Sequence, residues 1–308
     1  MGVARPRAKA TQALPDRQRQ LLTLLDAFGG ASGNLDFQKI LFLYCQESPV
    51  RGPYEFIPYK FGAFSYTSYA DRRRLIDRGF LANDDQQWQL TDAGRNAIGR
   101  TQDLLLTAFV RRVGDARGDA LVAETYRRFP YYATRSEIAD RVLRGDTAAL
   151  DRIAAAKPRT KSPTLSTIGY EGRSLERYLN DLLGAGTTVL CDVRRNPISR
   201  KYGFSKNTLA RGCDGVGIRY EHVPDLGIAS DQRQNLETQA DYDALFEHYE
   251  RAYLPGQSAT IAKIADWMRA GERVVLTCYE LLPEQCHRHC VSKALEKHLG
   301  KGCVTKHL

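Results

Sequence analysis

The sequence predicts an α/β protein. Its carboxyl-terminal half is expected to form an open, mainly parallel, Rossmann-like sheet with flanking helices, preceded by a mainly helical, winged-helix-like domain. Short β-rich runs alternate with helical patterns after residue 164, which indicates a parallel sheet. The first hundred residues instead place apolar residues at helical spacing. A proline-containing basic stretch separates the two patterns.

This stretch, AKPRTKSP, contains two prolines and no large apolar residue, which is typical of an exposed linker. A chain of 308 residues is long enough for two domains. We therefore expect a basic helical domain over 1–155, a linker over 156–163 and an α/β domain over 164–308.

The amino-terminal half is expected to begin with helices over 17–28, 35–46 and 66–78, because leucines and other apolar residues recur there at helical spacing. Gly79 is suited to end the third helix. Two short strands around 80–81 and 88–90 should follow, with a further helix opening at Thr91 or Asp92. This order of elements is typical of the carboxyl-terminal part of a winged-helix domain.

Four strings in this half, LDFQKILFLYC, YEFIPYKFGAFS, YADRRRLIDRGFL and QLTDAGR, resemble the Panacea-type antitoxin domain, also called SocA-like, over about residues 20–100. The resemblance implies a winged helix and a toxin–antitoxin or phage-defence setting. Since some domains of this type bind partner proteins rather than DNA, the resemblance leaves the ligand open.

Charge is unevenly distributed along the chain. Residues 1–163 hold 26 Lys and Arg against 18 Asp and Glu, whereas residues 164–308 hold 19 against 18, within a total of +9. A basic domain favours a polyanionic partner, so we expect DNA or RNA to bind there. The candidate contact residues are Lys60, Arg72, Arg73 and Arg74. A basic surface without a partner, or a protein partner, is the alternative.

The sequence contains no run of 18 apolar residues, and its first twelve residues form a short basic tail rather than a secretory leader. We therefore expect no membrane partner. The seven cysteines are odd in number within a long chain, which favours reduced thiols and a cytoplasmic protein over a disulfide framework.

The carboxyl-terminal half is expected to alternate strands and helices. The strands are predicted at 164–168, 188–193, 218–223 and 273–278, with a last edge strand at 303–305. The helices are predicted after Ser174, over 241–253, over 258–270 and from Pro283 onward. In such sheets, ligands bind at the carboxyl ends of the strands.

Polar residues follow each of these strand ends. Asp192 and Arg194 share one face of their strand, so they form either a structural ion pair or part of a ligand site. Five basic groups and two aromatic residues lie between Arg194 and Lys206, and such residues bind phosphates and stack on bases. This favours a phosphate-bearing ligand, for which the candidate residues are Tyr170, Arg194, Arg195, Ser199, Phe204, Lys206, His287 and Arg288.

The candidate catalytic residues are Glu171, Asp192, Cys278, Glu280 and Cys286. Among them Cys286 is the best candidate nucleophile, because a helix from Pro283 would place it in the first turn, where the helix dipole lowers a thiol pKa. The alternative is that Cys278 and Cys286 are small buried residues that only fill space.

A metal site is also considered. The cluster of cysteines and histidines from residue 278 onward lacks the paired C-x-x-C spacing of a zinc ribbon, and a magnesium site formed by Glu171, Asp192 and Glu280 is an equally open alternative. We therefore assign no metal ligand and no certain cofactor, and leave a divalent metal open.

Four further strings, TIGYEGRSLERYLNDLLGAG, LCDVRRNPISRKYGFSK, YEHVPDLG and LTCYELLPEQCHRHCVSKAL, resemble domain-of-unknown-function family 488 across about residues 164–308. The sequence departs from the family pattern at Ile228-Ala229-Ser230, where a glycine or a basic residue usually follows Leu-Gly. The positions that the resemblance carries over are Gly169, Tyr170, Glu171, Gly172, Asp192, Arg194, Pro197, Ser199, Phe204, Lys206, Leu226, Gly227, Cys278, Glu280, Cys286, His287 and Arg288.

Two functions are consistent with these features. One is an enzyme that processes a nucleic acid or nucleotide, with the basic domain holding the substrate. The other is a non-catalytic, antitoxin-like regulator that binds DNA or a protein and senses a nucleotide-like ligand. If the site is catalytic, replacing Arg194 or Cys286 by alanine should abolish activity with little change in melting temperature.

Overall fold

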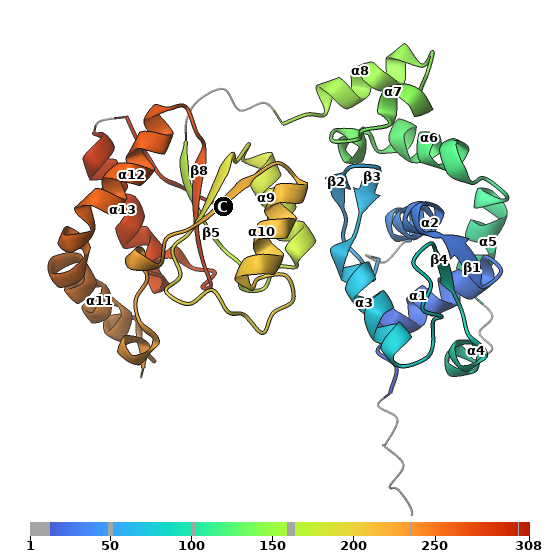
Figure 1. Cartoon of the computed structure of the whole chain (residues 1–308), viewed down its shortest axis with the longest axis horizontal. Helices are drawn as coiled ribbons and strands as arrows, with labels where there is room; N and C mark the ends of the chain where they lie inside the picture. Colours follow the sequence, from blue (N-terminus) through green and yellow to red (C-terminus); the bar gives the residue numbers. More distant parts are fainter. Residues whose placement is uncertain (1–12, 49–51, 100–102, 159–163, 235, 301) are drawn as a thin grey trace, which may run out of the picture. The chain divides into compact units, whose positions relative to one another are not determined.

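The computed structural model describes residues 13–48, 52–99, 103–158, 164–234, 236–300 and 302–308 (Figure 1). The chain packs as two units, one of Met1–Tyr54 with Ser68–Val122 and one of Glu55–Thr67 with Ala123–Leu308. The predicted basic tail and residues 159–163 of the predicted linker lie outside the described residues, so the linker stays a prediction. Within the described ranges, no helix is long and apolar enough to cross a bilayer.

The first unit is mainly helical, as predicted. The strand predicted at 88–90 is present as β4 (Gln87–Gln89), but it pairs antiparallel with β1 (Ala31–Gly33), which was not predicted, and the strand predicted at 80–81 is only a single bridge from Leu81 to Leu90. Thr91 caps the last of the predicted helices by accepting a hydrogen bond from Gly94 N. The elements are α1 Asp16–Ala27, β1 Ala31–Gly33, α2 Asn34–Glu47, α3 Tyr66–Asp77, β4 Gln87–Gln89, α4 Asp92–Ile98, α5 Leu104–Val113 and the start of α6 Gly118–Arg128.

Helix α2 buries a lysine, Lys39, which is 1% exposed. Burial lowers the pKa of Lys39 to about 7, from 10.5 for an exposed lysine. Between these two pH values the unfolded chain binds one more proton than the folded protein, so stability rises with pH.

We therefore expect the free energy of unfolding to increase by about 2 kcal/mol from pH 7 to pH 9 through Lys39 alone. The measurement is urea denaturation at both pH values for the wild type and for Lys39→Met, which keeps the length of the side chain and removes its charge. If the free energy of unfolding changes equally with pH in the two proteins, Lys39 does not contribute to that change.

The second unit contains a five-stranded sheet in which every strand is parallel to its neighbours. Its order is β7-β6-β8-β5-β9, and the three central strands are buried throughout, as expected for strands covered on both faces. The strands are β5 Leu165–Gly169, β6 Val189–Asp192, β7 Arg219–His222, β8 Val274–Cys278 and β9 Lys306–His307. This confirms the predicted open α/β fold.

Helices cover both faces of this sheet (Figure 1). Alternate residues of β8 point to opposite faces, so Val275 packs with α9 and α10, whereas Val274 and Leu276 pack with α11, α12 and α13. The helices are α9 Leu175–Gly184, α10 Lys206–Gly215, α11 Gln239–His248, α12 Ser258–Arg269 and α13 Arg288–Leu299.

The second unit also contains elements that the sequence did not reveal. These are the hairpin of β2 Ile57–Tyr59 and β3 Gly62–Phe64, the short helices α7 Ala139–Val142 and α8 Thr147–Ala155, and α10, which follows the predicted basic run. The hairpin strands have three residues each, which is too short for a periodic pattern.

Three predicted boundaries are wrong. The last helix begins at Arg288 rather than Pro283, because Pro283–Gln285 form only a 3₁₀ turn and Cys286 is extended. The edge strand lies at 306–307 rather than 303–305. Helix α11 ends at His248, and a π-helical segment, Tyr249–Tyr253, continues from it.

At the central strand β8, the helices that follow the strands change from one face of the sheet to the other. The helices after its neighbours β5 and β6 pack on one face, and α13, which follows β8, packs on the other. In open α/β sheets the crevice at such a point binds the ligand. The topology therefore directs attention to the residues that follow β8 at Cys278.

Candidate functional site

A pocket of about 310 Å³ opens at this crevice. Its size is at the lower end of the range for small-molecule sites. It is lined by Tyr170, Arg194, Arg195, Asn196, Ile198, Ser199, Arg200, Ile228, Arg233, Cys278, Tyr279, Glu280 and His287. The residues that follow β5, β6 and β8 therefore meet in one cavity, as predicted from the parallel sheet.

Asp192 and Arg194 form a buried ion pair. Arg194 donates from Nε to Asp192 Oδ1 at 2.8 Å and from Nη2 to Oδ2 at 2.5 Å, and Asp192 is fully buried. Tyr220 OH also donates to Asp192 Oδ2, at 2.6 Å. Burial alone would lower the pKa of Arg194, but the hydrogen bonds and charge of Asp192 raise it above its ordinary value. Of the two alternatives, the geometry favours a structural ion pair.

The rest of the Arg194 guanidinium is also held by protein groups. Nη1 donates to Tyr170 OH at 3.0 Å and to the Phe204 carbonyl at 2.9 Å. The Phe204 ring is fully buried and stacks on Tyr170 with centroids 4.4 Å apart. Phe204 is therefore a core residue, and the predicted role in stacking on a base does not fit its position.

Three other predicted residues point away from the pocket. Arg288 is buried and donates to the carbonyls of Glu280 and Leu281 at 2.6 and 2.9 Å, so it fixes the loop after β8. Lys206 Nζ lies 3.3 Å from His222 Nδ1. Glu171 accepts a hydrogen bond from Leu281 N at 3.0 Å. None of the three lines the pocket.

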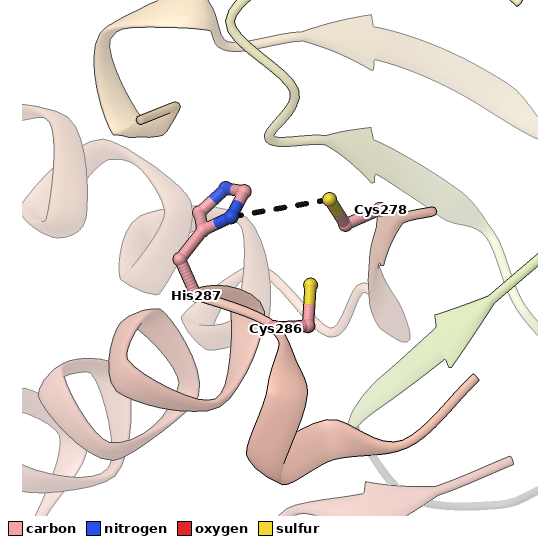
Figure 2. A group of neighbouring side chains, drawn as sticks. All are labelled: Cys278, Cys286 and His287. Carbon is pink, nitrogen blue, oxygen red and sulfur yellow. Dashed lines mark hydrogen bonds between the residues drawn. The ribbon is translucent and has the colours of Figure 1, made fainter. Parts of the chain in front are cut away.

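Cys278, Cys286 and His287 lie together (Figure 2), and Cys278 and His287 line the pocket. His287 Nε2 lies 3.0 Å from the Val193 carbonyl, which only accepts hydrogen bonds, so Nε2 carries the proton. In the neutral imidazole Nδ1 is then the acceptor nitrogen, and it faces Cys278 Sγ at 3.9 Å. Cys278 Sγ also lies 3.4 Å from Glu280 Oε2.

The two thiols differ in acidity, in the opposite sense to the prediction. A hydrogen bond from Cys286 lowers the pKa of Cys278 to about 7, with the charge of Arg233 contributing and burial opposing. Burial raises the pKa of Cys286. The expected helix-dipole effect on Cys286 is absent because α13 begins two residues later.

Two arginines supply the charge that the pocket can offer to a ligand. The Arg195 side chain is 50% exposed and lies 3.8 Å from Asp225, which is 64% exposed, so the ion pair is of a weak type. Arg200 is exposed and has no ion pair among the described residues. Arg233, by contrast, is paired with the nearly buried Glu280. Ser199 lines the pocket beside these groups.

Sequence reasoning missed two of these arginines as site residues. Arg200 belongs to the basic run between 194 and 206, so that run was a signal for it. Arg233 lies in the 3₁₀ segment Ser230–Arg233 after β7, and nothing in the local sequence marks it. Tyr279, which is 44% exposed at the pocket, was also missed.

The predicted nucleic-acid contacts lie in both units. Lys60 is in the β2–β3 turn of the second unit, 3.8 Å from Glu137. Arg72 in α3 donates to the Gln87 carbonyl at 2.8 Å and packs over Trp88, so it stabilises the first unit. Arg73 and Arg74 are exposed on the same helix.

A larger pocket, of about 670 Å³, lies where Thr188 and Arg273 precede β6 and β8. This is the amino-terminal edge of the sheet, whereas ligands of open sheets bind at the carboxyl edge. Its lining contains no cysteine or histidine. We therefore place the candidate site at the smaller pocket.

Fold and site together define an open-sheet α/β domain with a polar, arginine-lined pocket at its strand ends. Residues 174–295 match the family model described as "Domain of unknown function DUF488". This match confirms the second resemblance over that segment, while the Panacea-type resemblance over 20–100 stays a prediction. The comparisons with curated proteins and with solved structures found no match.

Proposed function

We propose that this is a nucleic-acid- or nucleotide-associated protein whose strand-end pocket binds a phosphate-bearing ligand. The observation that carries the proposal is that Arg195 and Arg200 both line the pocket and that neither is paired with a buried carboxylate. The pocket itself lies beside β8, where the helices that follow the strands change from one face of the sheet to the other. Guanidinium groups match phosphate oxygens in geometry and charge.

The rim of the pocket suits the remainder of such a ligand. Tyr279 and Ile198 are 44% and 76% exposed beside the arginines. An exposed aromatic ring next to guanidinium groups is the combination that binds bases and phosphates of single strands. The pocket therefore favours a nucleotide, or one nucleotide of a strand, over a simple inorganic anion.

Processing of the ligand is the preferred form of the proposal. Cys278 and Glu280 both line the pocket, so a nucleophilic or acid–base group is within reach of a bound ligand. A role in DNA or RNA processing or in phage defence follows from the amino-terminal resemblance and belongs to this proposal.

The proposal is tested by titrating fluorescent single-stranded DNA, single-stranded RNA and a nucleoside triphosphate with the full chain. In Arg195→Gln/Arg200→Gln we expect affinity for the bound ligand to fall by about 100-fold, since two charge-assisted contacts are lost. Arg251→Gln is the control, because Arg251 is exposed, lies in the same unit and is outside the pocket. Equal affinities in both variants would refute the proposal.

The second candidate is a non-catalytic regulator acting through the first unit. The order α1, β1, α2, α3, the Leu81–Leu90 bridge, β4 and α4, with β4 pairing with β1, supports a winged-helix interpretation. Helix α3 would then present Arg73 and Arg74. The same titration therefore includes Arg73→Gln/Arg74→Gln with duplex DNA. A loss of affinity for duplex DNA that is confined to Arg73→Gln/Arg74→Gln would favour the non-catalytic regulator.

A further inference from the structure

Three side chains of the types that bind metals lie together beside the pocket, and two of them, Cys278 and His287, line it. The ligand atoms of Cys278, Cys286 and His287 are all within 4.8 Å of one another, and all three residues are buried. Figure 2 shows them directed toward one common space, Cys278 from the end of β8 and the other two from the turn before α13. We propose that Cys278, Cys286 and His287 bind one zinc ion.

The spacing fits a tetrahedral ion after a small adjustment. With Zn–S of about 2.3 Å and Zn–N of about 2.0–2.1 Å, tetrahedral angles separate a sulfur and a nitrogen ligand by roughly 3.6 Å. The distance from Cys278 Sγ to His287 Nδ1 is 3.9 Å. For this pair, closure onto the ion needs a movement of roughly 0.3 Å, and the other ligand atoms lie within 4.8 Å of one another.

The imidazole is already oriented for this role. Its Nε2–H donates to the Val193 carbonyl at 3.0 Å, which fixes the ring and leaves the Nδ1 lone pair facing Cys278. A backbone carbonyl on the second ring nitrogen is a usual outer partner of a metal-bound histidine. The structure thus holds both the ligand set and the group that orients it.

Charge and ligand type select the ion. Two thiolates balance the charge of a divalent cation, and binding releases the thiol protons to solvent, which removes the cost of burying unpaired charge. Sulfur and nitrogen ligands favour zinc over magnesium or calcium. The three carboxylates considered as magnesium ligands do not meet in the pocket, because Asp192 is held by Arg194 and Glu171 lies outside the pocket lining.

The fourth position of this ion would face the ligand. Cys278 and His287 both line the pocket, so a water molecule or an anionic ligand oxygen can complete the coordination. Three protein ligands with an open position are the pattern of a catalytic zinc site rather than a closed structural one. The inference rests on the proposed function and changes one role in it: Cys278 becomes a zinc ligand rather than a nucleophile, and the cation would bind the same phosphate-bearing ligand.

A second set of side chains, Glu250, His289 and Cys290, also has its ligand atoms within 4.8 Å of one another, but it is a weaker candidate for a metal site. His289 is held much as His287 is, with Nδ1 2.8 Å from the Cys286 carbonyl and Nε2 3.4 Å from Cys290 Sγ, but Glu250 is exposed, so the third ligand of this set is a solvated carboxylate. This set is the natural competitor for the ion, and Cys290 therefore serves in the test.

The test is a titration of the reduced full chain with Co²⁺, which replaces zinc and reports thiolate ligation by its charge-transfer absorption. We expect one equivalent to bind, with visible bands of tetrahedral cobalt that Zn²⁺ then bleaches. Cys278→Ser, Cys286→Ser and His287→Gln should each weaken binding by more than about 100-fold, beyond the 10–100-fold typical of an outer partner. Cys213→Ser, a buried cysteine of the opposite core, should bind as the wild type does.

If the wild type shows no cobalt absorption, the inference is overturned. This outcome does not depend on any variant, so it holds even if a variant fails to fold. Retention of the bands in Cys278→Ser, or their loss in Cys290→Ser, also overturns it. Arg195→Gln/Arg200→Gln should bind cobalt normally. Failure of metal binding and failure of nucleotide binding are therefore distinguishable.

Discussion

Replacing Arg194 by alanine is expected to lower the free energy of unfolding by about 3–5 kcal/mol, because it leaves the carboxylate of Asp192 buried without its cation. Asp192 is fully buried and receives two hydrogen bonds from the guanidinium, and Arg194 also fixes Tyr170 and the Phe204 carbonyl. The sequence alone predicted the opposite, namely lost activity with little change in melting temperature.

Urea denaturation followed by circular dichroism measures this effect. Arg195→Ala is the matched control, since the neighbouring arginine is 50% exposed and its one ion pair is weak. We expect its free energy of unfolding to change by no more than about 0.5 kcal/mol. If Arg194→Ala and Arg195→Ala both lower the free energy of unfolding by a similar small amount, the Asp192–Arg194 pair does not stabilise the fold.

Replacing Gly169 by alanine is expected to destabilise the second unit by about 3 kcal/mol or more, a value typical of severe overpacking. A Cβ atom at this position would lie 1.8 Å from the Glu280 carbonyl oxygen and 2.6 Å from its carbon. Both are backbone atoms, so no side chain can rotate to make room. The loop after β8 must move, although Glu171 N and Arg288 hold it in place.

Gly184→Ala is the matched control, because nothing lies within 4 Å of an added Cβ there and the residue ends helix α9. Thermal unfolding of the two variants compares them directly. Since residues 279–280 line the pocket, Gly169→Ala should also weaken ligand binding more than Gly184→Ala does. Two variants with wild-type melting temperatures would contradict the close packing of β5 against this loop.

The fold could be predicted because its central strands are continuous apolar runs that alternate with helical patterns. The same reasoning predicted the place of the site, since parallel strands bring their carboxyl ends to one edge. Helix α10 was not predicted: only its first residue, Lys206, belongs to the basic run that was interpreted as a ligand loop. The helix from Pro283 was misplaced because a proline suited to a first turn here starts only a 3₁₀ turn.

Individual roles within the site were harder to predict than its position. Arg194 and Arg195 are adjacent in sequence, yet one is a buried structural cation and the other an exposed pocket residue. Arg288 binds backbone carbonyls that only the folded loop brings to it. Cys278 and Cys286 differ in pKa because one accepts a hydrogen bond from the other, which spacing does not reveal.

The pocket's proposed affinity for phosphate is tested most directly by the salt dependence of binding to a single-stranded oligonucleotide. Each phosphate contact contributes about −0.7 to the slope of log K against log salt concentration for single strands. If Arg195 and Arg200 contact phosphates, the slope for Arg195→Gln/Arg200→Gln should be shallower than that of the wild type by about 1.4, while Arg251→Gln keeps the wild-type slope. A double variant that retains the wild-type slope would contradict a phosphate-binding role for this pocket.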